Sequence, residues 1–172
     1  MKHILLIIGL ALAVSVTHAA DNIAKPESAS ASTDLYASGQ FSVSPFVGVN
    51  AAKLNPVDGK GDGGFTGLRL EYAVVKNIAI SVEGAAGDMH ERFIDQFAAH
   101  AKGYLPFGKS GLAGYGELGW QQFTGSDRNF MSTGAGVEVR GKRVSGFAGV
   151  RWLQDFKDVG FAQYLIGGSL RF

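Results

Sequence analysis

Most of the sequence alternates between apolar and polar side chains with a period of two residues. The clearest case is the segment 130–140, in which Met131 and Val137 fall on one face and Glu138 and Arg140 on the other. Successive side chains of a strand point to opposite faces, so this period predicts β-strands. Turn-type residues separate the alternating segments. We expect eight strands, over 41–52, 64–74, 78–87, about 93–105, 112–123, 130–140, 143–153 and 161–172.

The polar face of these segments mixes small residues with isolated charges of both signs near mid-strand. Eight strands closed into a barrel enclose an interior just wide enough for side chains to fill. Small residues and paired charges suit such an interior, so we expect the polar face to line the lumen and to form a polar network there. The residues of this expected network are Arg69, Glu71, Glu83, His100, Lys102, Glu117, Glu138, Arg140, Arg151 and Arg171.

Aromatic residues on the apolar face fall toward two ends. If the strands alternate in direction, Trp120 and Trp152 lie toward one end, whereas Tyr72 and Phe172 lie toward the other. A membrane barrel carries aromatic girdles at both interfaces, and a buried soluble core gives no reason for this segregation. Alternation alone would also fit a soluble periplasmic barrel of the lipocalin kind or a sandwich. The aromatics and the charged face favour a barrel whose apolar face contacts lipid.

The lengths of the connections support the same orientation. The connections after the odd-numbered segments hold five to eleven residues, and the others hold two to six. Membrane barrels have longer outer loops and shorter periplasmic turns. We therefore expect the longer connections, 53–63, 88–92, 124–129 and 154–160, to lie outside the cell.

The N-terminus predicts export. Residues 1–19 have a positive start, an apolar run over 4–16 and small residues before the expected cleavage site, as a signal peptide does. The alternative is an uncleaved anchor, but a helix needs about 20 apolar residues to span a bilayer. Residues 20–40 are rich in Ala and Ser and predict a flexible periplasmic lead-in, which leaves 41–172 as the barrel domain.

Composition narrows the classes of function. There is no cysteine, which excludes disulfides and thiolate metal sites. Of 16 Lys and Arg, one lies in the leader, so 15 remain against 15 Asp and Glu, and nothing here predicts nucleic-acid binding. Glycine, at 25 of 172 residues, is about twice its usual share of ~7%, and we expect it to serve strands and turns.

Together these features resemble the small eight-stranded outer-membrane barrels of bacteria, the transmembrane domain of the OmpA family and the OmpX family. The resemblance covers 41–172 and rests on the leader, the eight alternating segments and the terminal Leu170-Arg171-Phe172. It implies an all-β fold, an eight-stranded antiparallel up-and-down transmembrane β-barrel. It also implies a place in the Gram-negative outer membrane, in contact with its lipid and with lipopolysaccharide.

The same resemblance gives the last strand a role in biogenesis. In such proteins the final strand is similar to a tag that the barrel-assembly machinery reads. Its positions here are Tyr164, Ile166, Leu170 and Phe172, and Gly168 departs from the pattern because a larger apolar residue is usual there.

By resemblance, the expected role is structural, in envelope integrity and surface interaction, with a plugged lumen and no particular host ligand indicated. Two alternatives stay open. One is a narrow channel for small solutes. The other is an enzyme that modifies lipid A with His90 and Ser126, which lie in expected loops beside Asp88, Glu91 and Asp127. Catalysis requires a base within reach of a nucleophile, and no local sequence signature links these residues.

Metal binding has weak sequence support. The stretch 58–63 begins like a calcium loop, but its third position is Lys60 and its twelfth is Arg69, where a Glu is required. His100 could serve as a metal ligand or proton relay, but we favour a hydrogen-bonded place in the lumen network. We therefore expect no catalytic, metal-binding or cofactor-binding residues, and no cofactor.

Overall fold

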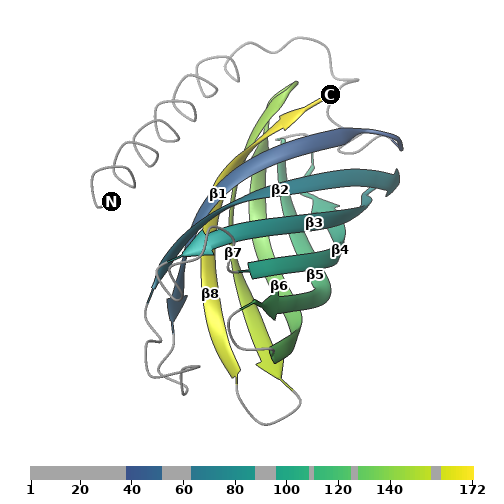
Figure 1. Cartoon of the computed structure of the whole chain (residues 1–172). Coiled ribbons are helices and arrows are strands. Elements are labelled where there is room, and N and C mark those ends of the chain that lie inside the picture. Colours follow the sequence, from purple (N-terminus) through teal and green to yellow (C-terminus); the bar gives the residue numbers. More distant parts are fainter. Residues whose placement is uncertain (1–37, 52–62, 88–95, 109–110, 125–127, 156–159) are drawn as a thin grey trace, which may run out of the picture.

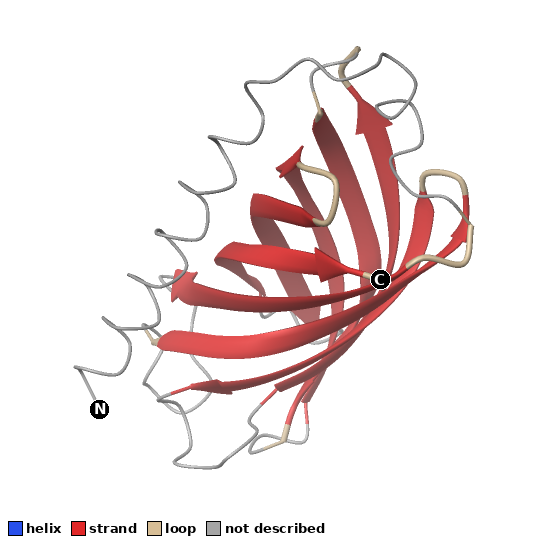
Figure 2. Cartoon of the chain, turned by 90° about the horizontal axis from the view of Figure 1, so that it is seen from above, coloured by secondary structure: helices blue, strands red, loops and turns tan. Residues whose placement is uncertain are grey.

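The structure is a computed structural model, and it describes residues 38–51, 63–87, 96–108, 111–124, 128–155 and 160–172. Figure 2 shows that its regular elements are all strands. Among the described residues, no helix is long and apolar enough to cross a membrane. The strands are β1 (Phe41–Ala51), β2 (Gly64–Val75), β3 (Ile78–Gly87), β4 (Gln96–Pro106), β5 (Leu112–Phe123), β6 (Arg128–Arg140), β7 (Val144–Asp155) and β8 (Gly160–Arg171).

The eight strands form a closed antiparallel barrel. Each strand pairs with its neighbour in sequence, and β1 pairs with β8 to close the sheet (Figure 1). The backbone N–H of Phe172 donates to the carbonyl of Phe41 at 2.9 Å, so the end of the chain is tied to the start of the first strand. The expected eight-stranded, up-and-down, all-β architecture is confirmed.

We call the end of the barrel that carries Phe41 and Phe172 the terminal end, and the opposite end the loop end. At the terminal end, connections of two, five and three residues join β2 to β3, β4 to β5 and β6 to β7. At the loop end the four connections hold 12, 8, 4 and 4 residues, so only the first two are longer than the terminal-end turns. In the β2–β3 turn, Asn77 has a φ of 62°, a left-handed conformation that Asn tolerates better than most residues. This turn therefore fits its sequence.

The observed strands differ from the expected ones mainly at the loop end. β6 begins at residue 128 and β7 extends to Asp155, so both reach into stretches expected to be loops. The reason is that pairing continues: Phe130 pairs with Asp155, and both side chains are buried on the inner face. Residues 93–95, expected to begin the fourth strand, lie outside the described part of the chain.

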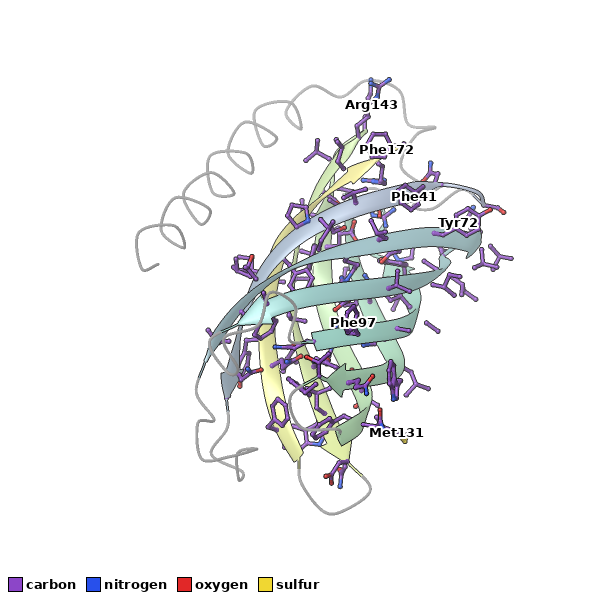
Figure 3. The ribbon with its side chains drawn as sticks, in the orientation of Figure 1. Phe41, Tyr72, Phe97, Met131, Arg143 and Phe172 are labelled. Carbon is purple, nitrogen blue, oxygen red and sulfur yellow. The ribbon has the colours of Figure 1, made fainter. Side chains whose placement is uncertain are left out.

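The outward face of the barrel is apolar. On this face or at its rims, 25 large apolar side chains have 38–72% of their surface accessible. Tyr72 and Phe172 lie toward the terminal end, and Trp120 and Trp152 lie toward the loop end. Figure 3 shows Tyr72 and Phe172 in the upper part of the view, where the chain ends. An apolar surface of this extent indicates contact with a membrane or a protein partner.

The inward face carries the polar and charged residues together with large rings, and glycine makes room for them. Six inward glycines lie directly opposite a large inward side chain on the neighbouring strand. At each of them an added Cβ would stand 2.8 Å or less from that side chain. The pairs are Gly48–Phe65, Gly67–Phe46, Gly119–His100, Gly134–Glu117, Gly136–Tyr115 and Gly167–Phe147.

These pairs explain much of the high glycine content. Because glycine has no side chain, the residue opposite can lie against the backbone of the wall and take up less of the narrow lumen. Outward glycines face a different situation, because a Cβ added at Gly103 would meet nothing within 4 Å. Inward and outward glycines therefore serve different purposes.

We predict that Gly67→Ala destabilises the barrel and that Gly103→Ala does not. The new methyl group at Gly67 would meet Phe46 Cζ at 2.5 Å and Ala85 Cβ at 2.8 Å. Such overpacking costs about 1–3 kcal/mol, whereas an unhindered surface change stays within about 0.5 kcal/mol. Urea unfolding of the protein in lipid vesicles measures both, and equal midpoints for the two variants would contradict the packing account.

Candidate functional site

The ten residues expected in the lumen network all belong to the inward face. Nine are buried, and Arg171 is partly buried near the terminal end, where its guanidinium donates to the carbonyl of Gly141 at 3.0 Å. The strands position them in layers, because side chains two residues apart on one strand point the same way at successive heights. We describe the layers from the centre outward.

Four charged side chains form a central ion cluster, defined as Arg69, Glu83, Glu117 and Arg151. The Arg151 guanidinium donates two hydrogen bonds to Glu83, at 2.9 and 3.0 Å, and one from Nε to Glu117 at 2.8 Å. Arg69 Nε donates to the same Glu83 at 2.6 Å. Arg69 also lies 3.9 Å from Glu117. Each cation therefore contacts both carboxylates, and β2, β3, β5 and β7 are joined across the lumen.

Aromatic rings surround the central ion cluster. The Arg69 guanidinium lies 4.8 Å from the ring centroid of Phe147 and 5.8 Å from that of Phe46. A cation over an aromatic face is attracted to it, and more so where water is excluded. Phe46 and Phe147 each lie over a paired glycine, so their place beside Arg69 depends on those glycines.

Toward the terminal end a second group of charges forms around Glu71. It accepts hydrogen bonds from Lys102 Nζ at 2.9 Å and from the Tyr104 hydroxyl at 2.7 Å. Lys102 also lies 4.4 Å from the centroid of the Tyr115 ring. These contacts join β2, β4 and β5.

Next to this group, Arg140 Nε donates to Glu138 at 3.0 Å. The two residues are neighbours on the same face of β6. The Arg140 guanidinium also lies 5.0 Å from the centroid of Tyr104, which connects the pair to the group around Glu71.

Toward the loop end the charges give way to amides. Gln121 donates to Gln96 at 2.9 Å, and Gln163 donates to Gln96 at 3.1 Å and to Asn50 at 2.8 Å. Arg151 reaches this layer through a 3.3 Å hydrogen bond to Gln121. The amide layer therefore continues the polar network to β1 and β8.

An apolar cluster lies beyond the amides at the loop end. It consists of Phe123, Phe130, Leu153 and Phe161, which are buried together. The three rings have centroids 5.4–5.7 Å apart in edge-to-face or tilted arrangements. Such geometry is favourable for aromatic pairs, and the cluster separates the amide layer from the loop end.

The amide layer and the apolar cluster were not among the expected site residues. Their positions follow from the strand period, since Phe161 and Gln163 alternate with outward residues as the charged positions do. The expected network contained only charged residues and His100, so it left out the rings and the uncharged amides on the same face. The inward face is therefore more apolar at the loop end than the charges alone predict.

The buried charges of the interior are nearly equal in number. Among the described residues, four buried cations (Arg69, Lys102, Arg140 and Arg151) accompany four buried glutamates (Glu71, Glu83, Glu117 and Glu138), with Asp155 buried near the loop end. Removing a charge from water costs several kcal/mol unless a partner and further hydrogen bonds compensate it. The observed pairing provides that compensation.

His100 lies between a serine and a glutamate. Its Nε2 is 3.1 Å from Ser132 Oγ, and its Nδ1 is 3.5 Å from Glu83 Oε1. A nucleophile, a base and an acid in this order resemble a catalytic triad. However, Ser132 is 0% exposed, and Glu83 already binds two guanidinium groups. In the described structure the row is therefore buried, and its contacts are hydrogen bonds and ion pairs within the lumen.

The same region contains the one metal-like grouping found among the described residues. Glu83, His100 and Glu117 each offer a ligand atom, all within 4.8 Å of one another. Both carboxylates bind Arg151 at 2.8–3.0 Å, so a cation would compete with a guanidinium for the same oxygens. The donor set is therefore used for ion pairing and fits a metal poorly.

Several residues singled out from the sequence lie outside the described part of the chain. These are the stretch 58–62, Asp88, His90, Glu91, Ser126 and Asp127. The proposed assembly positions are described, and all four, Tyr164, Ile166, Leu170 and Phe172, are exposed on the outward face. Gly168 lies on the same face of β8.

We predict that Glu83→Ala lowers the free energy of unfolding by about 3–5 kcal/mol, because Arg69 and Arg151 then lose a buried partner. Glu138→Ala removes the partner of Arg140 alone and should cost less. Lys142→Ala, on an exposed turn, is the control and should change little. Urea titration of the three variants in vesicles tests this order, and a Glu83→Ala midpoint equal to that of Lys142→Ala would refute it.

Comparison with known proteins identifies the fold. No protein-family model and no curated protein matches the sequence. Among solved structures, the chain is similar to the N-terminal barrel domain of Pseudomonas aeruginosa OprF (TM-score 0.60, 14% identity, 80% of this chain and 100% of that one). It is also similar to Neisserial surface protein A (0.58, 15%, 80% and 99%) and to Ail, the attachment invasion locus protein of Yersinia pestis (0.56, 15%, 78% and 99%). The chain has the fold of the small eight-stranded outer-membrane β-barrels.

Proposed function

We propose that this protein spans the bacterial outer membrane as a barrel with a filled interior, and that its role is structural and surface-related. The observation that carries the proposal is the contrast between the two faces. The outward face is apolar with aromatic residues toward both ends, whereas the inward face holds paired charges. In water this arrangement would expose the apolar face at high cost, but in a bilayer both faces are matched to their surroundings.

Closure of the sheet supports the same conclusion. A bilayer offers no water to hydrogen-bond an exposed strand edge, so only helices and closed barrels can span it. The pairing of β1 with β8 satisfies the backbone around the ring of strands. Strands of 10–13 residues also have the length needed to cross when tilted.

The filled interior argues against transport. Between Phe46, Phe65, Glu83 and Arg151 lies a small void of about 10 Å³, room for about one water molecule. The apolar cluster fills the lumen at the loop end. The groups around Glu71 and Arg140 fill it at the terminal end. Passage of a solute would require several ion pairs and ring contacts to separate together.

Delivery to the membrane is the second part of the proposal. We assign residues 1–19 to a cleaved signal peptide and 20–40 to a periplasmic lead-in. The outward positions of Tyr164, Ile166, Leu170 and Phe172 leave them accessible to the assembly machinery during insertion. In this orientation the terminal end faces the periplasm and the loop end faces the exterior, where it contacts lipopolysaccharide.

Catalysis has little support in the described residues. The Ser132–His100–Glu83 row is sealed inside the barrel, and the pair considered from the sequence, His90 and Ser126, lies in loops outside the described part. A structural role requires only the packed interior and the apolar exterior. We therefore favour it over modification of lipid A.

We predict that the protein resides in the outer-membrane fraction and shows heat-modifiable migration. A folded barrel resists unfolding by detergent at room temperature, so unboiled and boiled samples should run at different positions on a gel. A soluble periplasmic barrel would instead appear in the soluble periplasmic fraction, and that result would exclude the proposal.

We also predict that the purified protein forms no steady pore. In planar bilayers it should give no stable conductance steps, whereas an open porin measured in the same bilayers provides the positive control. Reproducible steps from the folded protein would show that the interior opens and would favour the channel alternative.

A further inference from the structure

We propose that a hollow on the outward face near the terminal end binds one diacyl phospholipid, with an acyl chain in the hollow and the phosphate at Lys76. The hollow, of about 560 Å³, lies over β3, β4 and β5, and its lining includes Ile78, Gly103, Leu105 and Gly116. This inference rests on the proposed function, since it requires the outward face to lie in a membrane.

The floor of the hollow is a pair of glycines. Gly103 and Gly116 lie directly opposite each other on β4 and β5. An added Cβ would meet nothing within 4 Å at Gly103, and only the carbonyl of Gly134, at 3.9 Å, at Gly116. In contrast to the inward glycines, no neighbouring side chain uses the space that this pair leaves.

Apolar side chains bound the hollow. Ile78, which pairs with Gly103, and Leu105 are 49% and 67% exposed beside it. Gly114 also borders it, but the Phe107 ring lies 3.1 Å from where its Cβ would be, so this edge is already covered. An empty hollow would leave its walls without dispersion contacts, and a hydrocarbon chain provides them.

Polar groups stand at the mouth of the hollow. Lys76 and Asn77, on the β2–β3 turn, belong to its lining. Lys76 is exposed and can bind a phosphate as a point charge. Asn77 Oδ1 is shielded from solvent, so the attraction for a headgroup at this mouth comes from Lys76.

The surrounding charge favours the same ligand. The exposed charged side chains described on the turns of the terminal end are Lys76, Lys142 and Arg143, all cations. A cationic rim attracts anionic headgroups. The hollow and the rim together match an anionic phospholipid of the periplasmic leaflet.

The test uses the full-length mature protein folded in a neutral detergent and mixed with phosphatidylethanolamine, phosphatidylglycerol or phosphatidylcholine. Native mass spectrometry then counts the lipids retained on the barrel. We expect one retained molecule of phosphatidylglycerol, in preference to the zwitterionic phosphatidylethanolamine and phosphatidylcholine, because its net negative charge matches the cationic rim. Equal retention of all three lipids would overturn the headgroup assignment.

Variants test the two halves of the site separately. Gly103→Leu places a branched apolar side chain in the hollow, starting from a Cβ that meets nothing within 4 Å, and Lys76→Gln removes the cation. Each should lower the apparent affinity roughly tenfold, the loss expected from one charge-assisted hydrogen bond or a comparable set of apolar contacts. The matched controls are Ala148→Leu, on the outward face of β7, and Lys142→Gln, on another turn of the terminal end.

The remaining outcomes separate this inference from the proposed function. Wild-type retention in Gly103→Leu would overturn the site. A dimer of the wild-type protein that Gly103→Leu disrupts would also overturn it, because the hollow would then receive a second copy. Heat-modifiable migration checks that each variant folds. Failure of the wild type to enter membranes would refute the proposed function, whereas entry with unselective lipid retention would refute the lipid site alone.

Discussion

The rest of the structure depends on the narrowness of an eight-stranded barrel. Its interior accommodates side chains from eight strands with little space to spare, so two large residues cannot face each other on adjacent strands at every height. This chain meets the constraint by placing glycine opposite a large inward residue, as in Gly67 opposite Phe46 and Gly136 opposite Tyr115. The rings can then lie against the wall. Glycine therefore acts here through the volume it leaves, and the lumen can hold both aromatic rings and charges.

Close packing in turn sets the electrostatics of the interior. A lumen without bulk water cannot solvate isolated charges, and each cation must find its partner within reach. Arg151 illustrates the solution, because its planar guanidinium bridges Glu83 and Glu117 and also reaches Gln121 in the amide layer. A lysine in its place could not bind two carboxylates with the same fixed geometry. Rings beside Arg69 and Lys102 supply further favourable contacts, so the packing and the ion pairs support each other.

Strand alternation predicted the architecture well, and it placed residues such as Glu83 and Arg151 on one face because the period of a strand is strictly two. It could not predict which of them touch. Glu83 and Arg151 are 68 residues apart, and their contact depends on the register of every strand between them. The glycine pairs could not be predicted for the same reason, because only the strand register shows that Gly67 lies opposite Phe46. The loop-end cluster was not predicted as part of the network because the network's residues were chosen by charge, although Phe161 alternates inward with Gln163.

The plugged lumen that we propose also moves the question of function to the surface. Ser132, His100 and Glu83 have the order of a catalytic row, yet packing denies them a substrate, which shows that residue identity and distance do not make a site without access. The outward face is different, because there the chain leaves a glycine pair uncovered next to a cationic turn. A barrel whose lumen is committed to stability can vary only its exterior and its loops without disturbing the ion pairs. This is the reason that we propose interactions with lipid and with the cell surface as the functions of this barrel.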